Sequence, residues 1–196
     1  VAVFMDVGAS GAYYVAMAAD SVIAHPTSVV GSIGVVMLRM NVEGLLEKLG
    51  LETSAIKSGA MKDMGSPFRT MTDEEYHVFM GVIMDFYNRF VQVVGEGRPG
   101  LKRDRVRELA DGRIYTAAQA LKAGLVDELG YLDTALDRAK QSAELTEARV
   151  VTYHRPGTYT NNIYSGLRDS STLRRIADWS QLPVGMPQFL YLWGAS

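Results

Sequence analysis

The chain opens with Val1-Ala2-Val3-Phe4-Met5-Asp6-Val7-Gly8-Ala9-Ser10-Gly11, and this stretch determines the fold class. Residues 1–5 are continuous, apolar and short, which is typical of a buried strand. Residues 8–11 predict a tight turn with two glycines. Residues 12–19 are rich in Ala, Met and Tyr and predict a helix packed closely against a sheet. A serine therefore stands where a buried strand turns sharply into a helix.

Beyond this opening, strands and helices alternate along the chain. A second glycine-flanked turn covers residues 31–34, and a long polar loop covers residues 57–67. Thr72 and Glu75 have the spacing of a capping box at a helix start, and Gly124 caps a later helix end. The alternation predicts an α/β layered domain. The expected strands are residues 1–5, 21–24, 52–56, 125–127 and 150–154, and the expected helices are residues 12–19, 42–49, 72 to about 94, 103–110, 116–123 and 132–143.

Composition and charge narrow the class of protein. The 196 residues suit one domain, or one domain with a docking tail, and 47% hydrophobic residues are enough for a core. The net charge of -2 and the absence of a Lys/Arg run argue against a nucleic-acid partner or an anionic membrane surface. The absence of cysteine excludes thiol nucleophiles, disulfides and zinc–thiolate sites.

The chain divides by composition into residues 1–155 and a tail of residues 156–196. The tail is rich in Gly, Tyr, Asn and Ser, and it ends in Phe189-Leu190-Tyr191-Leu192-Trp193, which predicts a docking segment. No stretch reaches the ~20 apolar residues that cross a bilayer. Because the sequence opens abruptly inside a strand-like run, we expect an upstream part, carrying a membrane anchor, to precede it.

Ser10 is the first candidate for chemistry. A serine between a strand and a helix can expose its hydroxyl while the first helical N–H groups point at the atom that it attacks. The following Gly11 lets a substrate approach the backbone. By spacing alone, a structural N-cap serine is the simpler interpretation.

A nucleophilic serine needs a base, and the sequence offers histidines and a lysine. His25, His77 and His154 all lie outside glycine-rich turns, so a structural role suits each of them better. Lys62 lies in the polar loop between two glycines. Burial can lower a lysine pKa by up to ~3–5 units, and a neutral lysine can take a serine proton. The alternative is a solvated surface lysine.

Other signals are weaker. Ser32, in the second glycine-flanked turn, is either a hydroxyl that orients the lysine amine or a plain turn residue. No His/Asp/Glu cluster has metal-ligand spacing, and no phosphate-binding glycine motif occurs, so we predict no metal and no cofactor.

Three groups of residues resemble the signal peptide peptidase A family. Ala9-Ser10-Gly11-Ala12-Tyr13-Tyr14 and Gly31-Ser32-Ile33-Gly34-Val35 look like its nucleophile region. Lys57-Ser58-Gly59 with Lys62-Asp63 and Gly65-Ser66-Pro67 resembles its lysine loop. Gly112-Arg113-Ile114-Tyr115-Thr116 and the following residues, to Gly130, are similar to a further family segment.

The resemblance implies a Clp-protease/crotonase-like α/β fold, here lacking its N-terminal part, with residues 1–155 as the C-terminal part of the catalytic domain. It implies peptide hydrolysis through an acyl-enzyme, with Ser10 as nucleophile and Lys62 as general base. Ser32 would orient the lysine, and the Gly11 N–H would be half of the oxyanion hole. Substrates would be hydrophobic peptides, chiefly remnant signal peptides, cut at the outer face of the bacterial cytoplasmic membrane.

The family also implies assembly. Its members are anchored by an N-terminal helix and form rings or domes, and in single-domain members the serine and lysine meet across a protomer boundary. Two departures stand out here: Ala12 replaces the usual second glycine after the serine, and the upstream glycine-rich loop with the other oxyanion donor is absent.

Other functions stay open at this stage. They are a non-catalytic scaffold on the same fold, a crotonase-type acyl-CoA enzyme, and another member of the peptidase family, such as one that processes phage capsids.

Overall fold

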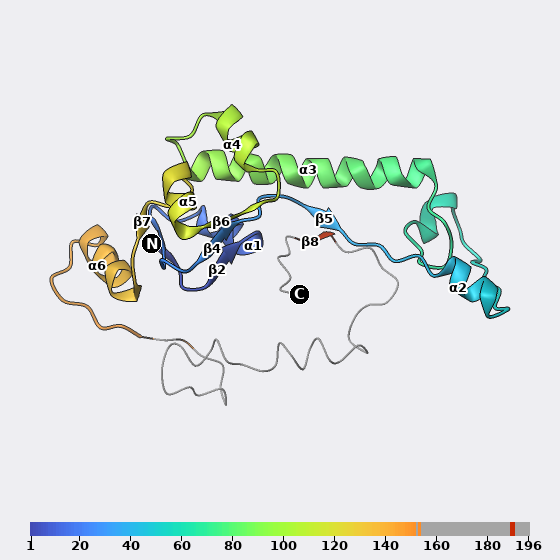
Figure 1. Cartoon of the computed structure of the whole chain (residues 1–196), viewed down its shortest axis with the longest axis horizontal. Coiled ribbons are helices and arrows are strands. Elements are labelled where there is room, and N and C mark those ends of the chain that lie inside the picture. The colour runs from blue at the N-terminus through green and yellow to red at the C-terminus, as the bar shows by residue number, and fades with distance from the viewer. Residues whose placement is uncertain (152, 154–188, 191–196) are drawn as a thin grey trace.

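The computed structural model describes residues 1–151, 153 and 189–190 (Figure 1). Two small sheets lie together at one end of the molecule. A parallel sheet has the strand order β1 (Ala2–Phe4), β3 (Val22–Ala24), β7 (Glu128–Leu129). A mixed sheet has the order β2 (Val7–Ala9), β4 (Val29–Gly31), β6 (Ile114–Thr116), with β2 and β4 parallel and β4 and β6 antiparallel.

One long helix runs along the molecule and connects two regions (Figure 1). Its first turn is closed by the predicted capping box between Thr72 and Glu75. The helices are α1 (Gly11–Ala16), α2 (Glu43–Lys48), the 3₁₀ turn η1 (Ala60–Asp63), α3 (Asp73–Gly97), α4 (Arg103–Leu109), α5 (Ala117–Ala123) and α6 (Leu132–Ser142). Of the shorter helices, α1 and α5 lie against the sheets, α4 packs on the long helix, and α2 lies at its far end.

The hydrophobic core lies where the sheets meet α1, α5 and the C-terminal half of α3. Tyr13 and Phe90 are fully buried there. The rings of Tyr14 and Phe90 lie edge to face with centroids 5.2 Å apart, which joins α1 to α3. The buried Tyr13 hydroxyl donates to the Leu125 carbonyl at 2.7 Å. These contacts fix the position of α1, and with it the residue that precedes α1.

The chain leaves this core after β5 (Val36–Met37), which pairs antiparallel with β8 (Phe189–Leu190). We call residues 38–72 the lysine arm. It carries α2 and η1, and Figure 1 shows α2 near the end of α3 that is remote from the sheets. The lysine arm exposes several large apolar side chains: Leu38, Met40, Leu45, Leu49, Leu51, Ile56 and Phe68.

The α/β fold class is confirmed, and most elements lie where the sequence predicted them. Helices form within residues 42–49, 103–110, 116–123 and 132–143, the helix expected at 12–19 runs from Gly11 to Ala16, and strands form within 1–5 and 21–24. Gly124 caps α5 in a left-handed conformation, as expected. The long helix, predicted to end at about residue 94, continues to Gly97.

Four predicted elements are wrong in detail. Residues 8–11 are not one turn, because Val7–Ala9 pair with β4 as strand β2. Residues 52–56 form no strand, because they are exposed and have no neighbouring strand among the described residues. The strand expected at residues 125–127 begins only at Glu128, because Leu125 still closes the end of α5 through its N–H bond to the Ala120 carbonyl.

The described residues of the strand expected at 150–154 are also not in a strand. Val150, Val151 and Tyr153 have no regular structure and are exposed, and residues 152 and 154 lie outside the described residues. The tail of residues 156–196 lies outside them too, apart from β8. None of the helices in the described part of the chain is both long and apolar enough to cross a membrane.

Candidate active site

Ser10 occupies a strained turn between β2 and α1. Its φ of 53° and ψ of -118° lie outside the regions that non-glycine residues usually adopt. Its N–H donates to the Gly31 carbonyl at 2.8 Å, and only 2% of the residue is exposed. The Ser10 side chain makes no capping hydrogen bond to α1, so the interpretation as a structural N-cap is not supported. Strain of this kind is found at functional sites more often than elsewhere.

Gly8 permits this turn to lie close to the core. A Cβ atom at Gly8 would stand 2.1 Å from the Phe4 ring, so no other residue fits without moving that ring. Gly11 begins α1, and the N–H of a first helical residue has no acceptor inside its own helix. The Gly11 N–H is therefore available as a hydrogen-bond donor beside Ser10, although the serine itself is buried in the single chain.

Ser32 lies next to Ser10 at the ends of two parallel strands. Ala9 in β2 is in register with Gly31 in β4, so the residues that follow them are neighbours. Ser32 has a positive φ of 50°, as Ser10 does, and its N–H donates to the Arg113 carbonyl at 2.8 Å. The structure therefore brings together three of the four predicted site residues: Ser10, Gly11 and Ser32.

The segment around β6 supports Ser32 from the other side, a role that sequence analysis missed. Gly31 has a φ of 98°, and a Cβ there would stand 2.6 Å from the Tyr115 ring. The Tyr115 hydroxyl donates to the Leu109 carbonyl at 3.1 Å, which holds that ring in place. The available signal was the strand-prone Ile-Tyr pair immediately before the capping box of Thr116 and Gln119.

An open cavity of about 520 Å³ adjoins Ser32. One wall is the chain after Ser32, and another is the middle of α3. Asp111 lies at this cavity, where the hydrogen bond from Arg113 lowers the pKa of its carboxyl. The apolar lining consists of Val35, Val36, Ile83, Met84, Tyr87 and Ala110.

Lys62 lies in η1, on the lysine arm, and is exposed. Among the described residues it has no hydrogen-bond or ion-pair partner for its side chain. The other lysine of the loop, Lys57, is already engaged, because its Nζ donates to the Asp63 carboxylate at 2.5 Å and to the Ala60 carbonyl at 3.0 Å. Lys62 is therefore the loop lysine whose amine is available.

Carboxylates around Lys62 are held in the charged form. Hydrogen bonds from Arg69, and then from Lys57, lower the pKa of Asp63 far below its usual range. The hydrogen bond from Arg69 also lowers the pKa of Glu75. Both carboxylates are therefore negative at neutral pH, and each already has a cationic partner.

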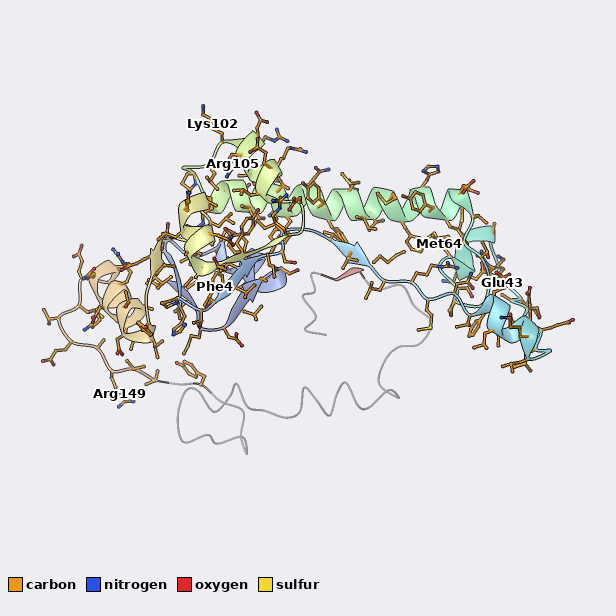
Figure 2. The ribbon with its side chains drawn as sticks, viewed as in Figure 1. Phe4, Glu43, Met64, Lys102, Arg105 and Arg149 are labelled. Atoms are coloured by element: carbon orange, nitrogen blue, oxygen red, sulfur yellow. The ribbon has the colours of Figure 1, made fainter. Side chains whose placement is uncertain are left out.

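The structure does not bring Lys62 to Ser10 within one chain. The Ser10 turn is joined to α3 at Phe90 through Tyr14, whereas the lysine arm is joined to α3 at Glu75 through Arg69. The helical rise places these two points roughly 22 Å apart. In Figure 2, Phe4 lies near the sheets and Met64 at the remote end of α3.

The histidines have other surroundings. The His25 ring lies 2.8 Å from the Thr27 hydroxyl and edge-on to Tyr131, and the His77 ring packs against Tyr76 on α3. His154 lies outside the described residues. Neither described histidine contacts Ser10, so the geometry gives no support to a histidine base.

Comparison with known sequences settles the family. The sequence model of peptidase family S49 matches residues 1–146. The chain belongs to peptidase family S49. The expected membership of a serine peptidase family is thereby confirmed, together with the layered α/β fold that it implies.

Several S49 relatives extend the match. The chain is 42% identical to a putative signal peptide peptidase SppA of Enterococcus faecium, over 91% of this chain and 50% of that protein. It is 36% identical to a putative protease of Synechocystis sp., over 97% of this chain and 73% of the relative. It is 34% identical to the chloroplastic serine protease SPPA of Arabidopsis thaliana, over 87% of this chain and 26% of that protein. The chain spans about half the length of the first of these relatives.

Proposed function

We propose that this chain forms part of a serine endopeptidase that hydrolyses hydrophobic peptides, with Ser10 as nucleophile and Lys62 as general base. The observation that carries the proposal is the backbone conformation of Ser10 and the lack of a capping hydrogen bond from its side chain. Its hydroxyl stands at a strained strand-to-helix turn of an S49 sequence and makes no capping bond, so it has no structural task within the helix.

The reaction follows acyl-transfer chemistry. The Ser10 hydroxyl oxygen attacks the peptide carbonyl carbon while a neutral Lys62 amine accepts the hydroxyl proton. The Gly11 N–H, unused by α1, donates to the carbonyl oxygen as it becomes negative. The protonated lysine then gives its proton to the leaving amine, and water hydrolyses the Ser10 ester in a second, equivalent step. Ser32, beside Ser10, would hold the lysine amine in line.

The lysine that serves each Ser10 would come from a neighbouring copy of the chain. Two observations support this arrangement. The first is the roughly 22 Å between the two attachment points on α3. The second is the apolar surface of the lysine arm, where Leu49 is 64% exposed and Ile56 is fully exposed, since exposed apolar surface of this kind marks interfaces. We therefore propose a homo-oligomer in which each complete site uses two protomers.

Hydrophobic peptides are the proposed substrate class, because the cavity beside Ser32 has an apolar lining along β5 and α3. The name of the Enterococcus faecium relative points to signal peptides as the source. We accordingly propose an enzyme that acts at the outer face of the bacterial cytoplasmic membrane, attached through a part of the protein that lies outside this chain.

A non-catalytic scaffold is the competing function, and one observation favours it. Within a single chain, Lys62 is an exposed lysine on the lysine arm, which is attached to α3 roughly 22 Å from the attachment of the Ser10 turn. A scaffold would need neither side chain. Membership of a peptidase family weighs against a crotonase-type acyl-CoA enzyme.

Hydrolysis of a fluorogenic hydrophobic peptide by the complete protein tests the proposal. We expect Ser10→Ala and Lys62→Ala each to lower kcat at least about 10³-fold, the scale seen when a nucleophile or its base is removed. Lys48→Ala is the matched control, because Lys48 is also an exposed lysine of the lysine arm. Near-normal turnover by Lys62→Ala would refute the lysine base, and an inactive wild-type assembly would favour the scaffold.

A further inference from the structure

Lys62 lies in a single 3₁₀ turn that cannot hold its own position. Among its bonds of the i to i+3 kind are those from the Lys62 N–H to the Gly59 carbonyl and from the Met64 N–H to the Met61 carbonyl, each 3.1 Å long. Short 3₁₀ turns have poor hydrogen-bond geometry and little stability of their own. A catalytic amine needs a fixed position, so the support must come from outside the turn.

Asp63, the residue after Lys62, provides the first connection. Its carboxylate accepts two bonds from the guanidinium of Arg69, from Nε at 3.0 Å and from Nη2 at 2.9 Å. Paired bonds of this kind fix orientation as well as distance. The same carboxylate also accepts the amine of Lys57, which closes the start of the loop onto its end.

Arg69 makes the second connection, to the start of the long helix. Its Nη1 donates to Glu75 Oε2 at 3.0 Å, and its Nη2 donates to Glu75 Oε1. Glu75 is 2% exposed and also accepts the Thr72 N–H at 2.9 Å within the capping box. One guanidinium thus joins the Lys62 turn to a buried carboxylate of α3.

A third contact fixes Arg69 itself. Arg39 donates to the Arg69 carbonyl at 2.5 Å and to the Ser66 carbonyl at 3.3 Å. The loop is therefore held by a chain of contacts from Lys57 through Asp63 and Arg69 to Glu75. Arg39, Lys57 and Arg69 each donate to oxygen acceptors, whereas the Lys62 amine has no acceptor among the described residues.

We infer that Arg69 is a positioning residue for Lys62, acting through Asp63 and Glu75 to hold the 3₁₀ turn at the end of α3. This inference rests on the proposed function, because it assigns a task to groups around the proposed base. Arg69 also keeps Asp63 occupied. Without Arg69, one oxygen of that carboxylate would be free to accept a hydrogen bond from the adjacent Lys62 amine.

The test compares variants of the complete protein in steady-state hydrolysis of a fluorogenic hydrophobic peptide. We expect Arg69→Gln to lower kcat about 10- to 100-fold with KM within about twofold, because a misplaced base slows the chemical step without weakening substrate binding. Arg69→Lys keeps a cation for one carboxylate and should lose less. Arg138→Gln is the control, since Arg138 forms an exposed ion pair with Glu128, away from the lysine arm.

The outcomes separate the inference from the proposed function. If Ser10→Ala and Lys62→Ala retain activity, the proposed function fails and the inference fails with it. If both are inactive but Arg69→Gln keeps the wild-type kcat, or changes KM alone, only the inference is overturned. Should Arg69→Gln not fold by circular dichroism, Glu75→Gln decides, because it keeps an acceptor for Thr72 but weakens the Arg69 bond; a wild-type kcat there also overturns the inference.

Discussion

The two ends of the proposed site are built in opposite ways. At the sheet end, Ser10 and Ser32 follow paired strands, and neighbouring side chains such as Tyr13 are fully buried. At the other end, Lys62 is exposed on a 3₁₀ turn held by ion pairs among side chains. Burial of apolar surface fixes the first end, while charge-assisted hydrogen bonds fix the second.

This difference agrees with the proposal that each chain supplies one half of two separate sites. A nucleophile must stand in a fixed relation to its oxyanion donors, so it benefits from a packed core. A base that serves another protomer must project from its own chain, and projection leaves little surface to bury. The lysine arm therefore depends on polar contacts, and the two ends should respond differently to substitution.

The largest effect on peptidase activity is expected when the serine and the lysine of each site come from different variant chains. Ser10→Ala and Lys62→Ala proteins are each expected to be inactive, but mixed subunits should regain activity. In a random equimolar mixture, about a quarter of the interfaces combine an intact serine with an intact lysine, so about a quarter of the wild-type rate should return. Activity is measured after dissociation and reassembly.

The control for this mixing experiment is subunit exchange itself, followed with two differently labelled proteins. If exchange is complete and no activity returns, the serine and lysine are not shared between protomers. Ser10 and Lys62 of one chain would then have to come together within that chain.

The second effect concerns packing at the sheet end. Gly8→Ala places a methyl group 2.1 Å from the Phe4 ring, and overpacking of this kind costs about 1–3 kcal/mol or more. We expect the midpoint of thermal unfolding to fall by at least about 2–4 °C, the scale for 1 kcal/mol in a protein of this size. The peptidase rate should fall as well, because Ser10 lies two residues away.

Gly44→Ala is the matched change on the lysine arm. A Cβ there meets no atom within 4 Å, and alanine is favoured over glycine inside a helix such as α2 by about 0.5–1 kcal/mol. Equal destabilisation by both substitutions would show that the packing difference between the two ends is not real.

The sequence was informative where local patterns decide structure. The strand within residues 1–5, the capping box at Thr72 and the cap at Gly124 all depend on residues close in the sequence, and all of these positions are confirmed. The predicted strand at residues 52–56 failed because a strand needs a partner, and local sequence does not say whether one is present.

The candidate site divides in the same way. The position of Ser10 between a strand and a helix was predictable, because an apolar run and a glycine turn define it. Its neighbour Ser32 comes from strand register, and the 22-residue separation along the chain hides that contact. The connection of Lys62 to α3 through Arg69 was also not predictable, since the sequence assigned Glu75 to the capping box alone and gave no sign that Arg69 joins Glu75 to Asp63.

The smallest effect is expected when one of two capping boxes with equal geometry, at Thr72 and Thr116, loses its threonine hydroxyl. Thr72 accepts the Glu75 N–H and Thr116 accepts the Gln119 N–H, both at 3.2 Å. Removing either hydroxyl with Thr72→Ala or Thr116→Ala should lower the free energy of unfolding by about 1 kcal/mol. Only Thr72→Ala should also lower kcat, because Glu75 holds both the cap and Arg69. Thermal unfolding and steady-state kinetics on the same samples check this, and an equal loss of kcat in both variants would mean that the Thr72 effect is one of overall stability, with no specific link to Lys62.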